Sequence, residues 1–163
     1  MSQRDAVIVG AVRTPVGVGK PGKGALSGIH PGDLSAHVLR ELVARAGVDP
    51  EVIDDVIWGC VSQVGEQAFN VGRNAALAAG FPESVPALTI DRQCGSSQQA
   101  VQFAAQAVAS GYSDLVVAAG LQSMSNIPMQ TLRKPAKIHD GPPKNTARCH
   151  ERFACCCCGK KRK

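Results

Sequence analysis

The segment from Gly95 to Ser113 contains no charged residue, and this constrains the fold more than any other feature of the chain. Most of its residues are small and apolar with glutamine interspersed, a pattern that indicates a helix. A helix without a charged, solvent-facing stripe packs against other elements on most of its sides. Its glutamines then need hydrogen-bond partners inside the protein or across a subunit interface. The sequence therefore predicts a helix that is buried between layers.

Strands and helices alternate along the sequence as far as Met129. Apolar runs rich in β-branched residues predict strands at 6–12, 55–61, 85–90 and 114–119. Helices are predicted from Asp33 to Gly47, from Asn70 to Ala79 and after Cys94. Asp33 is placed to cap the first helix, and Gly47 is placed to end it. This alternation predicts the α/β class with a largely parallel sheet.

Cys94 lies where the strand at 85–90 gives way to the charge-free helix. Gly95, Ser96 and Ser97 follow it, as expected of a tight turn and a helix start. The N-terminus of a helix presents unpaired N–H groups and a positive dipole end, which favour a thiolate. This arrangement suits a nucleophile, whereas a lone cysteine is in general more often a small buried hydrophobic residue. The local pattern leaves both interpretations open.

Four segments of the chain resemble, in the same order, motifs of the thiolases, the acyltransferases that form or cleave 3-ketoacyl-CoA. They are Ala-Val-Arg-Thr-Pro at 11–15, Asn-Val-Gly-Arg-Asn-Ala-Ala-Leu at 70–77, Asp-Arg-Gln-Cys-Gly-Ser-Ser-Gln-Gln-Ala at 91–100 and Ala-Ala-Gly-Leu-Gln-Ser-Met-Ser at 118–125. Ketoacyl synthases share the fold and a cysteine at a similar turn, but Gln98-Gln99 and the last of these segments look more like thiolases. The resemblance covers residues 6–129.

The thiolase resemblance implies the first, N-terminal half of a layered α/β fold in which a central catalytic helix is sandwiched between two sheets. It implies that Cys94 is the nucleophile that carries the acyl group as a thioester. Acyl-CoA is then the substrate, coenzyme A is not a permanently bound cofactor, and the full-length form is a homo-oligomer, either a dimer or a tetramer. No residue of this chain is identified as binding coenzyme A.

The other catalytic motifs of thiolases are missing from this chain. The family uses a His in a Gly-His-Pro motif, an Asn-bearing motif and a second Cys in a Cys-x-Gly-Gly-Gly motif. Two hypotheses follow. The first is a thiolase-class acyltransferase, for 3-ketoacyl-CoA thiolysis or acetyl-CoA condensation. The second is a non-catalytic truncated fragment, or a half-domain that needs a partner chain. Acyl-chain length and the direction of the reaction are not determined by these residues.

Charge and cysteine content change abruptly after Met129. Residues 1–129 hold 8 Lys and Arg against 11 Asp and Glu, whereas residues 130–163 hold 10 against 2. We therefore predict a partial thiolase N-terminal domain at 1–129, followed at 130–163 by a basic, Cys-rich tail that is disordered or translated out of frame. Four adjacent cysteines, 155–158, do not easily converge on one tetrahedral ion, so no metal site is predicted.

Neither a membrane nor a nucleic acid is a predicted partner. Acylation of the tail cysteines beside the basic end, and binding of nucleic acid by that end, are both weaker interpretations of the tail. No stretch of the chain has the length and apolarity of a membrane span, and the N-terminus does not have the pattern of a signal peptide. These features predict a cytoplasmic location, where thiols stay reduced.

The glycine-rich loop at 17–24 matches phosphate-binding motifs by spacing, but its context does not fit. Gly24 stands where a P-loop has Ser or Thr, and the next predicted helix begins too far away to receive a phosphate. We therefore interpret this segment as a connecting loop.

Five other residues carry weak functional signals, for which we favour structural roles. A salt bridge is expected for Arg13 and packing for Arg73. His30 and His37 are expected at the surface or in a helix cap, and Cys60 in the core.

Overall fold

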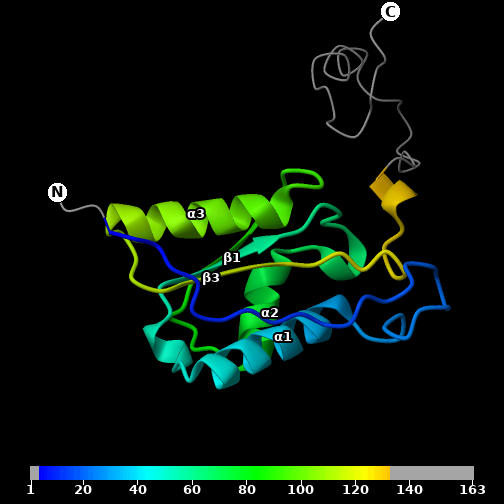
Figure 1. The fold of residues 1–163 in the computed structure, drawn as a ribbon. Coiled ribbons are helices and arrows are strands. Elements are labelled where there is room, and N and C mark those ends of the chain that lie inside the picture. Colours follow the sequence, from blue (N-terminus) through cyan, green and yellow to red (C-terminus); the bar gives the residue numbers. More distant parts are fainter. Residues whose placement is uncertain (1–3, 133–163) are drawn as a thin grey trace, which may run out of the picture.

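The computed structural model describes residues 4–132, and the predicted tail therefore lies almost entirely outside the described residues. Figure 1 shows the three helices and two of the three strands by label. The helices are α1 (Pro31–Ala46), α2 (Val71–Ala79) and α3 (Ser96–Ser110), and the strands are β1 (Asp55–Gly59), β2 (Ala87–Ile90) and β3 (Val116–Gly120). Short 3₁₀ turns occur at Pro50–Val52, Gly65–Gln67 and Met129–Leu132.

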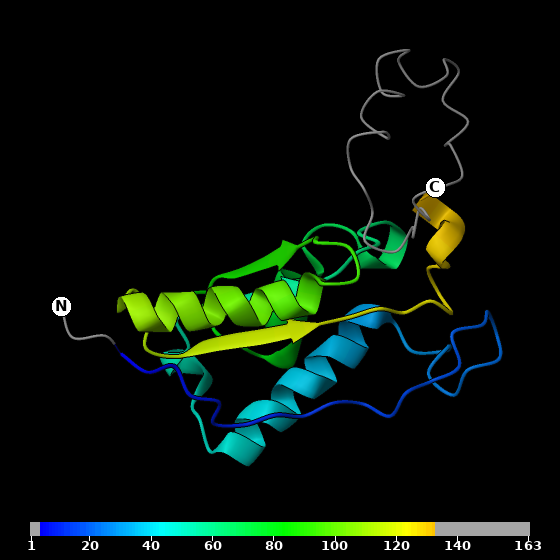
Figure 2. The ribbon, with the colours of Figure 1, turned by 45° about the horizontal axis from the view of Figure 1, so that its top comes forward.

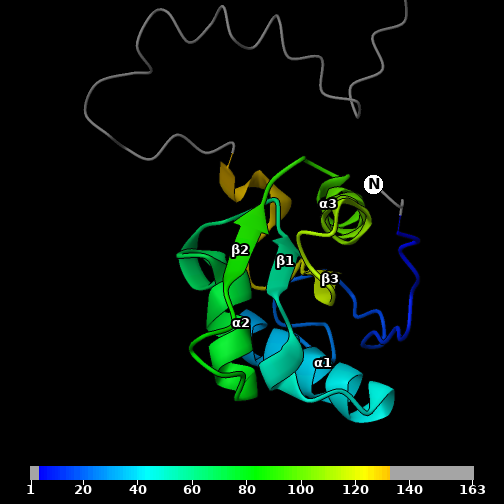
Figure 3. The same ribbon diagram turned by 90° about the vertical axis from the view of Figure 1, so that its left-hand side faces the viewer.

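The three strands form a parallel sheet in the order β2-β1-β3. Helices α1 and α2 pack on one face of the sheet and α3 packs on the other, as Figure 3 shows in a view with all three strands labelled. The predicted α/β class with a parallel sheet is therefore confirmed. The strands are shorter than predicted, and their C-terminal ends meet at one edge, where functional side chains gather in open α/β sheets.

The prediction of a first strand at 6–12 is wrong for the chain as it stands. These residues form no strand, and their backbone makes no hydrogen bond with another backbone group among the described residues. Val7, Ile8 and Val9 are between 66% and 82% exposed. Their composition is typical of a strand, but a strand also needs a neighbour to pair with. Figure 2 shows the segment, in blue, running alongside β3 without joining the sheet.

The first helix starts two residues earlier than predicted, so Asp33 is not its N-cap. α1 begins at Pro31, and the Nδ1 atom of His30 accepts a hydrogen bond from the Gly32 N–H at 3.1 Å. Proline is well tolerated in the first helical turn because its missing N–H is not needed there. Gly47 ends α1 in the left-handed region, with φ of 65°, as predicted.

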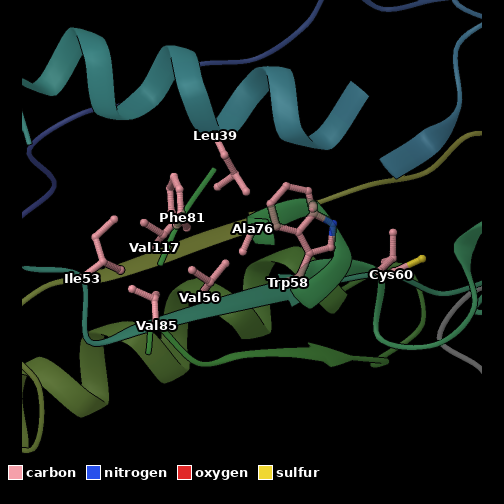
Figure 4. Close-up of a cluster of buried hydrophobic side chains, with 11 residues drawn as sticks. Leu39, Ile53, Val56, Trp58, Cys60, Ala76, Phe81, Val85 and Val117 are labelled. Carbon is pink, nitrogen blue, oxygen red and sulfur yellow. The ribbon is translucent and has the colours of Figure 1, made fainter. Parts of the chain in front are cut away.

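The larger hydrophobic core lies between the sheet and the pair α1 and α2. Figure 4 shows Leu39 of α1 and Ala76 of α2 around side chains of β1, with Trp58 in the middle. Successive side chains of β1 point to opposite faces of the sheet. Val56 and Trp58 therefore belong to this core, whereas Ile57 packs with α3 on the other face.

Only the side of α3 that faces the sheet is buried in this chain. Ser96, Ala100 and Ala104 are buried against the sheet, whereas Val101 and Phe103 are 47% and 42% exposed. The prediction of a helix buried on most sides is therefore wrong for the described residues. The outer side has no charged residue to interact with water, and no described element covers it.

Two glycines let the start of α3 lie directly on the sheet. A Cβ atom added to Gly59 would be 2.5 Å from the backbone nitrogen of Ser97, and one added to Gly120 would be 1.9 Å from the Ser97 Oγ. Glycine in a strand often marks such a close approach of another backbone. Gly59 and Gly120 end β1 and β3, so the contact fixes α3 at the C-terminal edge of the sheet.

We expect Gly59→Ala to destabilise the fold by about 2–3 kcal/mol, because the methyl group would meet backbone atoms that have no room to move. Gly28→Ala is the matched control: nothing lies within 4 Å of its added Cβ, and its effect is expected within about 0.5 kcal/mol. Urea denaturation followed by circular dichroism measures both. Equal midpoints for the two variants would contradict the close contact.

Asp54 joins the starts of β1 and β3. Its Oδ2 atom accepts hydrogen bonds from the N–H groups of Asp114 and Leu115, at 2.6 and 3.0 Å. The hydrogen bond from Leu115 and then that from Asp114 lower the pKa of this carboxyl group, because they stabilise its charged form. The stabilisation is present above the ordinary pKa of about 4, and it is lost as the pH falls through the lower, folded-state pKa.

Asp54→Ala should therefore lower the urea midpoint at pH 7, and the difference from the parent chain should shrink as the pH falls below the ordinary aspartate pKa of about 4. Glu83→Ala serves as a control, since Glu83 is exposed and its side chain forms no ion pair among the described residues. Urea titrations at several pH values provide the comparison. A difference that stays the same down to acid pH would show that the carboxylate does not act through its charge.

Candidate active site

The candidate site is the turn that joins β2 to α3. Ile90 ends β2, Ser96 begins α3, and Cys94 lies between them. This turn is at the C-terminal edge of the parallel sheet, where ligands bind in open α/β folds. The contact of α3 with Gly59 and Gly120 holds the helix start at the same edge. The structure thus places Cys94 immediately before a helix N-terminus, as the sequence predicts.

The residue before the cysteine has an unusual backbone conformation. Gln93 has a φ of 48°, in the left-handed region that residues with a side chain rarely adopt. Its N–H donates to the Asp91 Oδ1 atom at 2.7 Å, and its carbonyl accepts from the Ser96 N–H at 3.0 Å. Strained backbone of this kind persists where surrounding contacts hold it, and it is common at functional sites.

Ser96 holds the turn closed through its side chain. Its hydroxyl group donates to the Gln93 carbonyl at 2.6 Å and accepts from the Arg92 N–H at 2.9 Å. The residue is 4% exposed, so water competes little for these bonds. From the sequence, Ser96 is predicted only to be part of a helix start. A serine two residues after a candidate nucleophile gives no sequence signal that separates it from an ordinary first-turn residue.

Arg92 provides hydrogen-bond partners for two of the α3 glutamines. Its guanidinium donates to the Gln99 side-chain oxygen and, at 3.4 Å, to that of Gln102. The sequence predicted that these glutamines need partners inside the protein or across an interface. In this chain, Arg92 meets that need at the surface of α3.

The two cysteines of the described residues differ in access. Cys94 is exposed, whereas Cys60 is buried with 1% exposure. Burial raises the pKa of the Cys60 thiol, and a backbone hydrogen bond from Ser62 opposes this to a smaller extent. Gln67 also directs its Nε2 atom to the Cys60 sulfur at 3.6 Å. Cys60 is therefore a core residue, as predicted, and Cys94 is the accessible thiol of the two.

Arg73 and the two histidines have the structural roles that the sequence predicts. Arg73 donates to the carbonyl groups of Val85 and, at 2.9 Å, Glu83, so it packs the loop that follows α2. His30 caps α1, and His37 is exposed on the same helix.

Two further predictions have different outcomes. Arg13 donates to the neighbouring Thr14 carbonyl at 3.1 Å and forms no ion pair among the described residues, so the predicted salt bridge is wrong. No carboxylate reaches it because it lies in the exposed N-terminal segment. The loop at 17–24 ends before any helix begins, which agrees with its interpretation as a connection.

Residues 4–132 contain no cluster of three or more side chains that could hold a metal ion. Within the same part of the chain, every helix is too short or too polar to cross a membrane. The cysteines and histidines of the basic tail, which are Cys149, the four cysteines at 155–158, His139 and His150, lie outside the described residues.

Alkylation with iodoacetamide should distinguish the two cysteines. Cys94 is expected to react readily, and Cys60 more than about tenfold more slowly, because Cys60 must first be exposed by local opening. Mass spectrometry of proteolytic peptides assigns each label despite the tail cysteines. Alkylation in urea is the control, since both sites should then react at similar rates. Rapid labelling of Cys60 in the folded chain would contradict its burial.

Comparison with known proteins agrees with this geometry. Residues 6–151 match the family described as thiolase, N-terminal domain, a range that extends beyond the motifs at 11–125. The chain is 55% identical over 127 residues to the steroid 3-ketoacyl-CoA thiolase FadA6 of Mycobacterium tuberculosis, covering 78% of this chain and 30% of that protein. It is 45% identical over 143 residues to a 3-ketoacyl-CoA thiolase of Erwinia tasmaniensis, covering 87% and 36%.

A solved structure shows the same fold. The crystal structure of the Bacillus anthracis acetyl-CoA acetyltransferase matches with a TM-score of 0.71 and 41% sequence identity, covering 89% of this chain and 36% of that one. The chain thus spans about a third of the length of these proteins. With the family match, the parallel sheet and the order of the motifs in agreement, we conclude that this chain belongs to the thiolase family, as its N-terminal part.

Proposed function

We propose that this chain takes part in acyl transfer of the thiolase class and that Cys94 carries the acyl group as a thioester. The observation that carries the proposal is the position of Cys94, exposed on a strained turn between β2 and the N-terminus of α3. A cysteine at such a position is open to a substrate, and the thiolate form of cysteine is the one that attacks a thioester. The names of the relatives supply the substrate class, acyl-CoA.

The chemistry combines a thioester exchange with the formation or cleavage of a carbon–carbon bond. The condensation direction begins with the exchange. The Cys94 Sγ atom attacks the carbonyl carbon of acyl-CoA, the bond from that carbon to the coenzyme A sulfur breaks, and the released thiolate takes up a proton. In condensation the acyl group then passes from Cys94 to the α-carbon of acetyl-CoA, which gives up a proton, and Sγ is released.

Thiolysis is the reverse: Sγ attacks the C3 carbonyl of 3-ketoacyl-CoA, the bond between C2 and C3 breaks, and C2 takes up a proton as acetyl-CoA leaves. The acyl group then passes from Cys94 to the sulfur of coenzyme A. Each step needs an acid or base and hydrogen-bond donors for the oxyanion.

The described residues supply Cys94 but not an evident acid or base for it. Of the two histidines within residues 4–132, His30 caps α1 and His37 is exposed on α1. The Gly-His-Pro and Cys-x-Gly-Gly-Gly motifs that the resemblance implies do not occur in the 163 residues. The alternative proposal is therefore a non-catalytic fragment, or a half-domain that needs a partner chain for the complete reaction.

Further parts of the proposal rest on the resemblance to thiolases. We include a homo-oligomer, dimer or tetramer, for the complete protein, with coenzyme A as a substrate and no permanent cofactor. We also include a cytoplasmic location and a domain boundary near residue 129. The boundary is supported by the change in charge along the sequence.

The acyl-enzyme is the species to look for. The full chain is incubated with acetyl-CoA, and the intact mass and the Cys94 peptide are measured after acid quenching. We expect one acetyl group on Cys94, none in Cys94→Ala, and unchanged labelling in Cys60→Ala, because Cys60 is buried.

The outcomes separate the two hypotheses. Acetylation that is lost only in Cys94→Ala supports the acyltransferase. Absence of acetyl-Cys94 at high protein concentration, with Cys94 still reactive toward iodoacetamide, rules out independent acyl transfer and favours the half-domain.

A further inference from the structure

Arg92 lies between the end of β2 and Cys94, and its backbone forms hydrogen bonds across the cysteine. Its N–H donates to the Ser96 Oγ atom at 2.9 Å, and its carbonyl accepts from the Gly95 N–H at 3.1 Å. Figure 3 shows the chain leaving β2 and crossing to α3 through this turn. The backbone of Arg92 is therefore bonded to the two residues that directly follow Cys94.

The side chain of Arg92 reaches further along α3. One guanidinium nitrogen, Nη1, donates to the Oε1 atom of Gln99 and, at 3.4 Å, to that of Gln102. These glutamines are three positions apart, so they lie on the same side of the helix. The residue at the end of the strand is thus bonded to the first two turns of α3.

The positive charge of Arg92 is not used in an ion pair among residues 4–132. Asp91, its direct neighbour, instead accepts the Gln93 N–H at its Oδ1 atom, at 2.7 Å. The guanidinium donates to uncharged amide oxygens of α3, and hydrogen bonds with one charged partner are stronger than those between neutral groups. These bonds connect the turn to the helix, which a surface ion pair would not do.

Gln93, between Arg92 and Cys94, has a backbone conformation that depends on its surroundings. Its φ of 48° costs free energy for a residue with a side chain, and such a conformation persists only where neighbouring contacts hold it. Its carbonyl accepts from the Ser96 N–H in the first turn of α3. If Arg92 released α3, Gln93 could relax to an ordinary conformation. The direction of the Cys94 side chain would then change, because it follows from the backbone before it.

We propose that Arg92 is a positioning residue for acyl transfer at Cys94. Its guanidinium holds the strained turn on α3, so that the Cys94 sulfur meets the thioester carbonyl in a fixed orientation. A misplacement of about 1 Å lowers the rate of such an oriented reaction by on the order of a hundredfold. The role in acyl transfer rests on the function proposed above for Cys94, whereas the hold on the turn does not.

Two substitutions of Arg92 and a matched control test this role. Arg92→Met keeps the aliphatic stem and removes the donors, whereas Arg92→Lys keeps a cationic group with three N–H donors. Arg40→Met is the control. Arg40 is also exposed, and its Nη1 atom also donates to an uncharged acceptor, the Ala78 carbonyl, at 2.9 Å.

Amide hydrogen exchange measures the hold on the turn without any acyl chemistry. The full 163-residue chain is used, and exchange is followed at Gly95 and Ser96, whose N–H groups close the turn. We expect exchange at least about fivefold faster in Arg92→Met, and within about twofold of the parent chain in Arg92→Lys and Arg40→Met. Unchanged exchange in Arg92→Met, or an equal increase in Arg40→Met, overturns the proposal.

Two reactions of Cys94 measure its orientation. Rate constants for acetylation by acetyl-CoA and for alkylation by iodoacetamide are compared in each variant. Arg92→Met should slow acetylation about tenfold or more and change alkylation by less than about threefold, because the small reagent needs access rather than a fixed approach. Arg92→Lys should recover at least about half of the parent acetylation rate. An unchanged ratio of the two rate constants in Arg92→Met overturns the positioning role.

A further variant removes the acceptors and leaves Arg92 in place. Gln99→Leu/Gln102→Leu should match Arg92→Met, and combining all three changes should add no further effect, since they act on the same bonds. Additive effects would contradict the contact. The double variant replaces Arg92→Met if the latter loses its circular dichroism signal. If the parent chain forms no acetyl-Cys94, the proposed function fails for the chain alone, and hydrogen exchange then decides whether Arg92 holds the turn.

Discussion

The close contact between the start of α3 and the ends of β1 and β3 is the constraint on which the rest of the structure depends. Gly59 and Gly120 have no side chain, and the first turn of α3 occupies the space that a Cβ would need. β2 belongs to the same sheet and leads through the Cys94 turn into α3. The contact between α3 and the sheet therefore fixes both ends of this turn. The Ser96 hydroxyl then holds the turn closed from inside. The candidate site is therefore positioned by the sheet itself rather than by a mobile loop.

Much of the fold could be predicted from the sequence because its signals are local. The apolar runs at β1, β2 and β3 lie between helices with clear ends, such as Gly47 and Gly80 in the left-handed region. The parallel arrangement follows from the alternation of these elements. The position of Cys94 before a helix also follows from the neighbouring residues. These predictions needed no knowledge of distant contacts.

The predictions that were wrong depended on contacts that local patterns do not record. The residues at 6–12 have strand composition, but the described residues provide no strand to pair with them. The charge-free α3 was expected to be covered on most sides, and its outer side is exposed because no described element reaches it. Both failures have the same physical origin, since the sequence of these elements suits a larger structure than residues 4–132 form. Gln93 and Ser96 were missed because backbone strain and a buried hydroxyl have no distinct sequence pattern.

The pairing pattern of the sheet has a consequence for the order in which the site is made. Val56 in β1 pairs with Ala87 in β2 and with Val117 in β3, so each ladder joins segments far apart in the chain. Such non-local contacts form slowly because long loops must close first. The Cys94 turn lies inside the loop that β3 closes when it pairs with β1. During synthesis from the N-terminus, Cys94 therefore leaves the ribosome before the strand that completes the support of its turn, and the turn acquires its final geometry only when β3 has docked.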